Sequence, residues 1–132
     1  MKYLLDSTVL IDFGTGFPPG LEIMERLFRE STELYTCDVV TCESLSRGRA
    51  EELDLILSAI EALEYVAVDP AGARWAGDRR RERIEAGNRK PSVGDALIAG
   101  LAWRLGATVV TRNARDFEAF GIPVLGYGPL QT

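Results

Sequence analysis

The sequence predicts a single α/β domain with a parallel five-stranded sheet between two layers of helices. Five short apolar runs rich in β-branched and aromatic residues recur along the chain, and amphipathic helical patterns separate them. A chain of 132 residues with 46% hydrophobic content can bury one sizeable core. Because successive strands separated by helices need crossover connections, the alternation favours parallel pairing with helices on both faces.

The expected strands are five apolar runs spread over the whole chain. In order they are KYLL, ELYTC, YVAV, TVVT and PVLG, at residues 2–5, 33–37, 65–68, 108–111 and 123–126. Their length and their content of β-branched and aromatic residues are typical of buried strands.

Three apolar stripes with helical spacing lie between these strands. They are formed by Leu21, Met24, Leu27 and Phe28, by Leu53, Ile56, Leu57, Ile60 and Leu63, and by Val93, Leu97, Leu101 and Leu105. Pro18 marks the start of the first helix, and Gly106 and Gly121 follow helical segments where a left-handed residue is expected. We expect residues 13–20 and 85–94 to be loops at the rim of a site.

The sequence contains no histidine, which limits the chemistry available to the protein. Catalytic triads with histidine, histidine-based zinc sites and histidine-driven RNA cleavage through the 2′-OH are all excluded. Cys37 and Cys42 belong to no Cys-x-x-Cys pair, so we expect reduced thiols. A hydrolase of this composition must use carboxylates and a hard metal ion.

No stretch of the sequence is apolar for long enough to cross a membrane. The longest, such as ALIAGLAW at 96–103, fall far short of the roughly 20 residues that a spanning helix needs. The amino-terminal segment MKYLLDSTVLIDF contains acids where a signal peptide needs a continuous apolar region. We therefore expect a cytoplasmic protein.

The net charge of −5 argues against a passive nucleic-acid-binding protein, which normally has an excess of basic residues. Of the 15 basic residues, however, only Lys2 and Lys90 are lysines. The others are arginines, and many of them cluster at 46–49, 79–83 and 111–115. Arginine has the best geometry for bidentate contacts to phosphate, and the candidates for such contacts are Arg47, Arg49, Arg112 and Arg115. Ordinary surface charge is the alternative for these residues, and a solvated helix face is the alternative for the run RRRER.

Four carboxylates are expected to meet at one edge of the sheet. Asp6 directly follows the first strand, and Asp116 lies just past the fourth. Glu43 falls one or two helical turns after the second strand, and Asp95 lies in the first turn of the helix that leads into the fourth. Ligands of open parallel sheets gather at the carboxyl ends of the strands. Clustered carboxylates raise one another's pKa and favour a counter-ion, and oxygen ligands suit Mg²⁺ or Mn²⁺.

Helix capping is the alternative role for two of these acids. Ser92 and Asp95 have the spacing of a capping box, and Asn113 and Asp116 repeat it. The residues by themselves leave either role open.

Three segments in a fixed order resemble a PIN-domain protein, and most closely a VapC-type toxin ribonuclease. They are YLLDSTVLID at 3–12, TCESLSRG at 41–48 and SVGDALIAGLAWRLGATVVTRNARDFEAFGIPVLGY at 92–127. The resemblance covers nearly the whole chain and implies a three-layer α/β/α PIN fold, with residues 1–132 as a single PIN domain. It also implies endoribonuclease activity, a small VapB-like antitoxin that blocks the site, and Mg²⁺ or Mn²⁺ held by acids corresponding to Asp6, Glu43, Asp95 and Asp116.

The resemblance extends to polar residues around these acids. Ser7 or Thr8, and Thr111 with Asn113, match positions that line the family's pocket. Many relatives carry aspartate where this chain has Asn113, whereas here the acid falls three residues later, at Asp116. Residues three apart on a helix share a face, so Asp116 can supply the missing charge. The expected assembly is a homodimer or a toxin–antitoxin hetero-oligomer.

Two other classes of protein remain as alternatives. One is a catalytically silent module that keeps the PIN fold only for its partner, and the presence of all four acids argues against it. The other is a receiver domain, which needs adjacent acids after the first strand and a lysine after the last. Here Asp6 is followed by Ser7, and no late lysine occurs. A phosphatase with an Asp-x-Asp nucleophile is also disfavoured, because Asp6 is followed by Ser7 and Thr8 and the second aspartate is missing.

Overall fold

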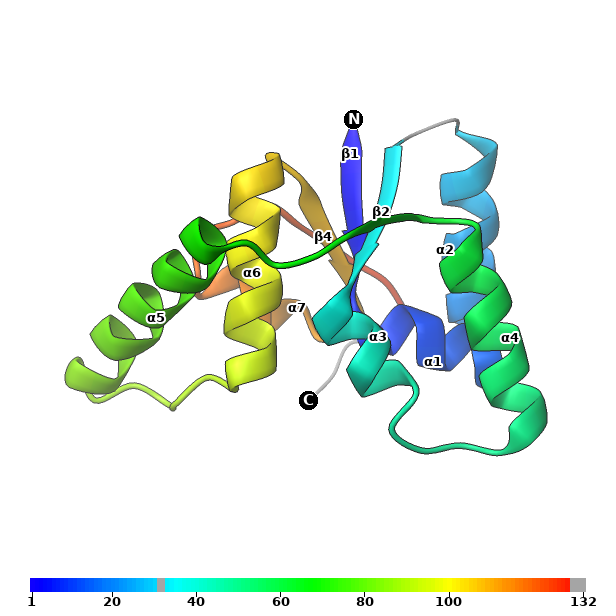
Figure 1. Cartoon of the computed structure of the whole chain (residues 1–132), viewed down its shortest axis with the longest axis horizontal. Coiled ribbons are helices and arrows are strands. Elements are labelled where there is room, and N and C mark those ends of the chain that lie inside the picture. Colours follow the sequence, from blue (N-terminus) through cyan, green and yellow to red (C-terminus); the bar gives the residue numbers. More distant parts are fainter. Residues whose placement is uncertain (31–32, 129–132) are drawn as a thin grey trace.

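The computed structural model describes residues 1–30 and 33–128, which form a five-stranded sheet with helices on both faces (Figure 1). The strands pair in parallel in the order β3-β2-β1-β4-β5. In chain order the elements are β1 (Lys2–Leu5), α1 (Ser7–Thr15), α2 (Pro18–Arg29), β2 (Glu33–Cys37), α3 (Asp38–Ser44), α4 (Ala50–Glu61), β3 (Glu64–Val66), α5 (Pro70–Glu85), α6 (Val93–Leu105), β4 (Thr108–Thr111), α7 (Ala114–Glu118) and β5 (Val124–Gly126). The predicted fold class is confirmed.

The strand order explains how the helices form two layers. The chain crosses the sheet in one direction from β1 to β3 and in the other from β3 to β5, so right-handed crossovers place their helices on opposite faces. In Figure 1, α5 and α6 pack together on one side, and α1, α2 and α4 lie on the other. Helix α3 begins at the carboxyl end of β2 and contacts both α1 and α6.

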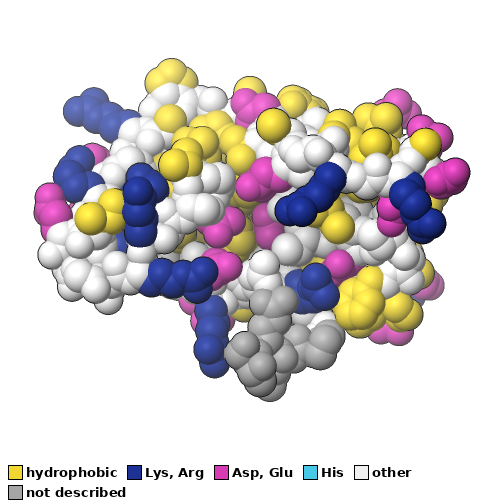
Figure 2. All heavy atoms as spheres, turned by 90° about the horizontal axis from the view of Figure 1, so that it is seen from below, with side chains coloured by type: hydrophobic (Ala, Val, Ile, Leu, Met, Phe, Trp, Pro, Cys, Tyr) yellow, Lys and Arg dark blue, Asp and Glu magenta, His cyan; other side chains and the backbone are white. Residues whose placement is uncertain are grey.

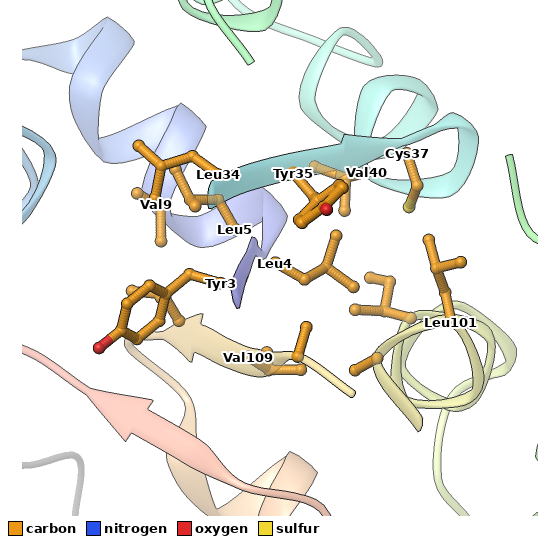
Figure 3. Close-up of a cluster of buried hydrophobic side chains, with 14 of the residues drawn as sticks. Tyr3, Leu4, Leu5, Val9, Leu34, Tyr35, Cys37, Val40, Leu101 and Val109 are labelled. Carbon is orange, nitrogen blue, oxygen red and sulfur yellow. The ribbon is translucent and has the colours of Figure 1, made fainter. Parts of the chain in front are cut away.

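The central strand β1 is buried on both faces. Leu4 and Leu5 are fully buried, and Figure 3 shows Leu4 pointing toward Leu101 of α6 while Leu5 points toward Val9 of α1. Successive strand residues alternate between the two faces, so one strand anchors both helical layers. Burying each of these leucines contributes roughly 1.5–3 kcal/mol. The residue that follows β1 is therefore placed by the best-packed part of the molecule.

The predicted strands are confirmed in the centre of the sheet and shift at its edges. Strands β1, β2 and β4 have the expected bounds, whereas β5 begins one residue later and β3 ends at Val66 rather than residue 68. The backbone N–H of Val68 donates to Asp38 Oδ1 at 3.2 Å, so a side chain replaces its strand partner. Edge strands are the elements whose ends depend most on such local contacts.

The loop predicted at 13–20 is wrong. Helix α1 runs to Thr15 and α2 starts at Pro18, so only two residues connect them. Gly16 has the left-handed φ of 77° that ends a helix, and Pro18 occupies the first turn of the next helix, where its missing N–H costs nothing. The loop predicted at 85–94 is confirmed in its central part, because α5 ends at Glu85 and α6 begins at Val93.

The helical stripes are only partly buried. In α2 the core residues are Ile23, Met24 and Leu27, while Leu21 and Phe28 remain 39% and 44% exposed. In α4, Leu57 is similarly exposed. Both cysteines are free thiols, as expected. Among the described helices, none combines the length and the apolar character that crossing a membrane requires.

Candidate active site

Asp6 lies at the carboxyl end of β1 and is only 3% exposed. Its backbone N–H continues the β1–β4 pairing by donating to Val110 O at 3.0 Å. Its carboxylate accepts hydrogen bonds from Thr111 Oγ1 at 2.8 Å and Thr8 Oγ1 at 3.1 Å, and a longer one from Ser7 Oγ at 3.4 Å. Three hydroxyl groups thus orient a buried carboxylate.

The two threonines also fix the turn after β4. The backbone N–H of Arg112 donates to Thr8 Oγ1 at 3.1 Å, and that of Asn113 donates to Thr111 Oγ1 at 3.0 Å. These bonds join the β1–α1 junction to the β4–α7 junction. Of the polar residues expected around the acids, Ser7, Thr8 and Thr111 contact Asp6, whereas Asn113 is linked to it only through Thr111.

Glu43 reaches the site from α3, next to the start of α6. Its Oε1 atom is buried and has no hydrogen-bond partner among the described residues. A Cβ atom at Gly94 would collide with Glu43 Oε2, so a larger residue there would force this carboxylate to move. Asp95 follows Gly94 in the first turn of α6. Gly94 is a site residue that sequence reasoning missed, although it lies inside the quoted motif SVGDALIAG.

The four acids influence one another electrostatically. Burial and the charges of Asp6, Asp116 and Glu43 together raise the pKa of Asp95 to about 6, with burial as the largest cause, and the Ser92 hydroxyl partly offsets them. Burial also raises the pKa of Glu43, with Asp6 as the next cause, and burial raises the pKa of Asp6 itself despite its hydroxyl donors. Asp95 thus lies within electrostatic reach of the other three acids, and Glu43 within reach of Asp6, at the edge where the four carboxylates were expected to meet.

The two predicted capping motifs behave differently. Ser92 caps α6, because its Oγ accepts the backbone N–H of Asp95 at 3.0 Å. Asn113 precedes α7, but its side chain makes no capping bond and its Oδ1 is buried without a partner among the described residues. Of the two open roles, capping by the Asn113 side chain is therefore absent from this structure. With φ −107° and ψ 58°, its backbone lacks the extended conformation of a capping residue.

A pocket of about 350 Å³ opens beside these acids, between α5, the 86–92 connection, α6 and α7. Asp95 and Asp116 contribute to its wall. Figure 2 shows the face at the carboxyl ends of the strands, where acidic side chains gather in the middle and basic side chains lie on both sides. Of the four arginines predicted to contact phosphate, Arg115 lines this pocket.

Arg112 is engaged in a buried polar cluster instead. Its Nε lies 3.3 Å from Asp12 Oδ2, its guanidinium sits over the ring of Phe17, and the Tyr127 hydroxyl donates to Asp12 at 2.7 Å. Asp12 is 4% exposed, and a Cβ at Gly20 would collide with it. The members of this cluster are up to 115 residues apart, so no local sequence pattern predicts it.

The two remaining predicted arginines lie between α3 and α4. Arg49 precedes α4, where Glu52 Oε1 accepts its backbone N–H at 2.9 Å and pairs with its guanidinium at 3.4 Å. Arg47 lies two residues earlier, in the same connection. Both residues are on a different side of the acids from the pocket wall formed by α5 and α7.

The acids fit a hard divalent cation by donor type. Carboxylate oxygens are the ligands that Mg²⁺ and Mn²⁺ prefer, and the buried Glu43 Oε1 has no hydrogen-bond partner among the described residues. Within residues 1–30 and 33–128, no three acidic or thiol side chains are arranged as a complete metal site. Ion binding at this edge therefore requires the side chains to adjust around the ion.

The sequence model of the PIN domain matches residues 3–122 of this chain. The chain belongs to the PIN-domain family. Its relatives include Ribonuclease VapC19 of Mycobacterium tuberculosis, which is 28% identical over 117 residues that cover 89% of this PIN domain and 93% of the relative. The VapC ribonuclease Mb1587 of Mycobacterium bovis is 30% identical over 119 residues, which cover 87% and 88% of the two chains.

Solved structures agree with this assignment. The structure of DNA-bound VapBC from Salmonella typhimurium matches this PIN domain with a TM-score of 0.81 and 26% identity, covering 96% of this chain and 98% of that one. VapBC2 from Rickettsia felis bound to a promoter DNA fragment matches with a TM-score of 0.82 over 97% and 100% of the two chains. At 19% identity, the latter supports the fold alone.

Proposed function

We propose that this PIN domain is a VapC-type toxin, an endoribonuclease that cleaves RNA phosphodiester bonds with Mg²⁺ or Mn²⁺. The observation that carries the proposal is the electrostatic coupling of Asp95 to Asp6, Glu43 and Asp116 in a largely buried edge of the sheet. Such a cluster costs stability when it is ionised and uncompensated, which a purely structural role does not explain. The curated relatives are named as VapC ribonucleases.

Each acid has a distinct part in the proposed site. Asp6, Glu43 and Asp95 would hold the ion, and Asp116 would add a fourth charge through water or help to recruit a second ion. When bound, the ion supplies Lewis-acid polarisation of the phosphate and a water of lowered pKa. Thr8 and Thr111 keep Asp6 in one orientation through their hydroxyl bonds.

Water rather than the ribose 2′-OH is the expected nucleophile. The chain has no histidine to act as the acid or base that attack by the 2′-OH needs. In-line attack by water gives a 5′-phosphate and a 3′-hydroxyl, and end-group labelling of the fragments tests this. Fragments with a 2′,3′-cyclic phosphate would contradict the mechanism.

Cleavage should depend strictly on a divalent ion. We expect a labelled RNA to be cut with Mg²⁺ or Mn²⁺ and left intact with excess chelator. Asp6→Asn should abolish cutting, whereas Asp54→Asn on the exposed surface of α4 is the matched control and should cut as the wild type does. Cutting that survives the chelator would exclude the carboxylate–metal mechanism. Failure to cut with any divalent ion would favour the catalytically silent module.

The proposed inhibitor is a small VapB-like antitoxin with an amphipathic helix and a basic tail. The first helical layer exposes apolar side chains for such a helix, namely Ile11, Leu21, Phe28, Leu55 and Leu57. Met24 of α2 does not belong to this surface, because it is only 4% exposed. Acids without a bound ion attract basic side chains, so the tail would insert Arg or Lys among them.

The antitoxin proposal is tested by co-purification with the product of the adjacent reading frame. Leu21→Ser with Phe28→Ser should weaken that complex at least tenfold, whereas Ile84→Ser, an equally exposed residue on α5, should not. A protein that stays monomeric and has no affinity for this product would contradict the toxin role. A cytoplasmic location is proposed with this function, since RNA is the substrate and both cysteines are free.

A further inference from the structure

The basic residues of the chain divide into two groups according to their partners. Within the part of the chain that the structure describes, seven ion pairs with carboxylates engage Arg26, Arg29, Arg49, Arg79, Arg81, Arg104 and Arg112. The other eight of the 15 basic residues have no carboxylate partner there. Four of these eight line the single pocket beside Asp95 and Asp116, and they are Arg83, Arg89, Lys90 and Arg115.

These four side chains come from three separate segments that are tied together. Arg83 projects from the last turn of α5 and donates to the carbonyl of Ala119 after α7 at 3.5 Å. Arg89 and Lys90 belong to the connection before α6, which Arg80 holds by donating to the carbonyl of Pro91 at 2.9 Å. The wall of the pocket is therefore anchored to α5 and α7.

The charge distribution favours a negatively charged occupant. Four uncompensated cations around one concave pocket repel one another, and two carboxylates at its edge offset only part of that charge. The acid cluster, in turn, repels the phosphates of any RNA that approaches it. Cations placed next to the acids offset this repulsion, and guanidinium groups bind phosphate in a bidentate manner.

We propose that this pocket binds the backbone phosphates of the RNA segment on one side of the scissile bond, through Arg83, Arg89, Lys90 and Arg115. The inference rests on the proposed ribonuclease function and identifies the side on which the RNA chain leaves the acids, toward α5 and α7. The volume of the pocket, about 350 Å³, lies at the lower end of the range for small-ligand pockets. Phosphate contacts of this kind position the substrate without reading its sequence.

The test is the salt dependence of RNA binding in the presence of chelator, where no cleavage is expected. The fluorescence anisotropy of a labelled single-stranded RNA gives the binding constant at a series of salt concentrations. Each lost phosphate contact should reduce the slope of log K against log salt by about 0.7. Arg89→Gln with Lys90→Gln should therefore reduce it by about 1.4, and Arg83→Gln or Arg115→Gln by about 0.7 each.

The matched control is Arg26→Gln with Arg29→Gln on α2, which removes the same charge from exposed residues that pair with Glu30 and Glu25. Its slope should stay close to that of the wild type. Pocket variants that bind RNA as the control does would overturn the proposal, as would pocket variants that lose binding of an acidic peptide while keeping that of RNA. If the pocket variants overturn the proposal but the wild-type protein still cleaves RNA, the ribonuclease function stands and only the role of the pocket is wrong. Absence of cleavage with every divalent ion would count against that function separately.

Discussion

Thr111 Oγ1 donates a 2.8 Å hydrogen bond to Asp6 Oδ2, and this bond connects the carboxyl ends of the neighbouring strands β4 and β1. Both residues are almost fully buried. The hydroxyl of Thr111 also accepts the backbone N–H of Asn113, so one side chain orients the first acid and the turn that leads to the fourth.

Thr111→Val should reduce RNA cleavage at least tenfold at neutral pH. Valine keeps the shape of threonine but removes the donor to Asp6 and the acceptor for Asn113, and a hydrogen bond to a charged group is worth roughly 1.5–3 kcal/mol. The pKa of Asp6, which burial already raises, should rise further. The measurement is the pH profile of kcat/KM. Thr111→Ser retains the hydroxyl and should restore most of the rate. Equal loss in both variants would show that packing, not hydrogen bonding, matters here.

Asp95→Asn should stabilise the protein at neutral pH in the absence of metal. The pKa of Asp95 is raised from 3.8 to about 6 by burial and its acidic neighbours. Between these values the folded state holds a proton that the unfolded chain has released. The free energy of unfolding therefore falls as pH rises through this window, and the cost is fully present above it.

Urea unfolding with chelator at several pH values measures this effect. The stability difference between Asp95→Asn and the wild type should be small near pH 4 and should grow toward pH 7. Added Mg²⁺ should stabilise the wild type more than the variant. A variant that is less stable than the wild type at pH 7 would instead assign Asp95 a mainly capping role at the start of α6.

Gly94→Ala should displace Glu43 or destabilise the fold. The added Cβ would collide with Glu43 Oε2, and overpacking of this kind costs typically about 1–3 kcal/mol. Activity should fall together with stability. Gly77→Ala in α5 is the matched control, because nothing lies within 4 Å of its added Cβ. In a helix interior, replacing glycine by alanine should raise the free energy of unfolding by about 0.5–1 kcal/mol. Thermal unfolding of both variants separates the collision from a general helix effect.

Asn113→Ala should cost little stability, well under the roughly 1 kcal/mol of a lost helix cap, since its side chain makes no capping bond. Asp116→Asn should lower activity more than tenfold with little change in unfolding, because it removes charge from the pocket wall. Combining Asn113→Asp with Asp116→Asn should rescue cleavage if charge near the ion is what counts. A fully active Asp116→Asn variant would remove Asp116 from the proposed site.

The central strands could be predicted from the sequence, and so could the places of Asp6, Asp95 and Asp116 beside strand or helix ends, since each depends on a local pattern. KYLL followed by Asp6 is an apolar strand with an acid at its end, and Ser92 with Asp95 marks a helix start. Helix α1 was not predicted, because STVLIDFGT buries residues on several sides and has no clean stripe. Contacts between distant segments were also beyond the sequence, as in Arg112 with Asp12.

The basic pocket illustrates the same limit. Arg83, Arg89 and Lys90 were not among the predicted contact residues, because their proximity to Asp116 depends on how the connection before α6 folds. Arg47 and Arg49 were predicted from the density of arginines along the chain, yet Arg49 pairs with Glu52 at the start of α4. Sequence clustering of arginine therefore did not identify which cations lack a carboxylate partner.

The pairing of β1 with β4 sets a condition on when the protein can become active during its synthesis. The central strand has only one neighbour until residues 108–111 leave the ribosome, and Asp6 has no Thr111 partner before then. Contacts this far apart in sequence form late in folding. A nascent chain that ends before β4 thus carries Asp6, Glu43 and Asp95 without the strand that brings them into register. The proposed cleavage of RNA therefore requires a chain that extends through β4.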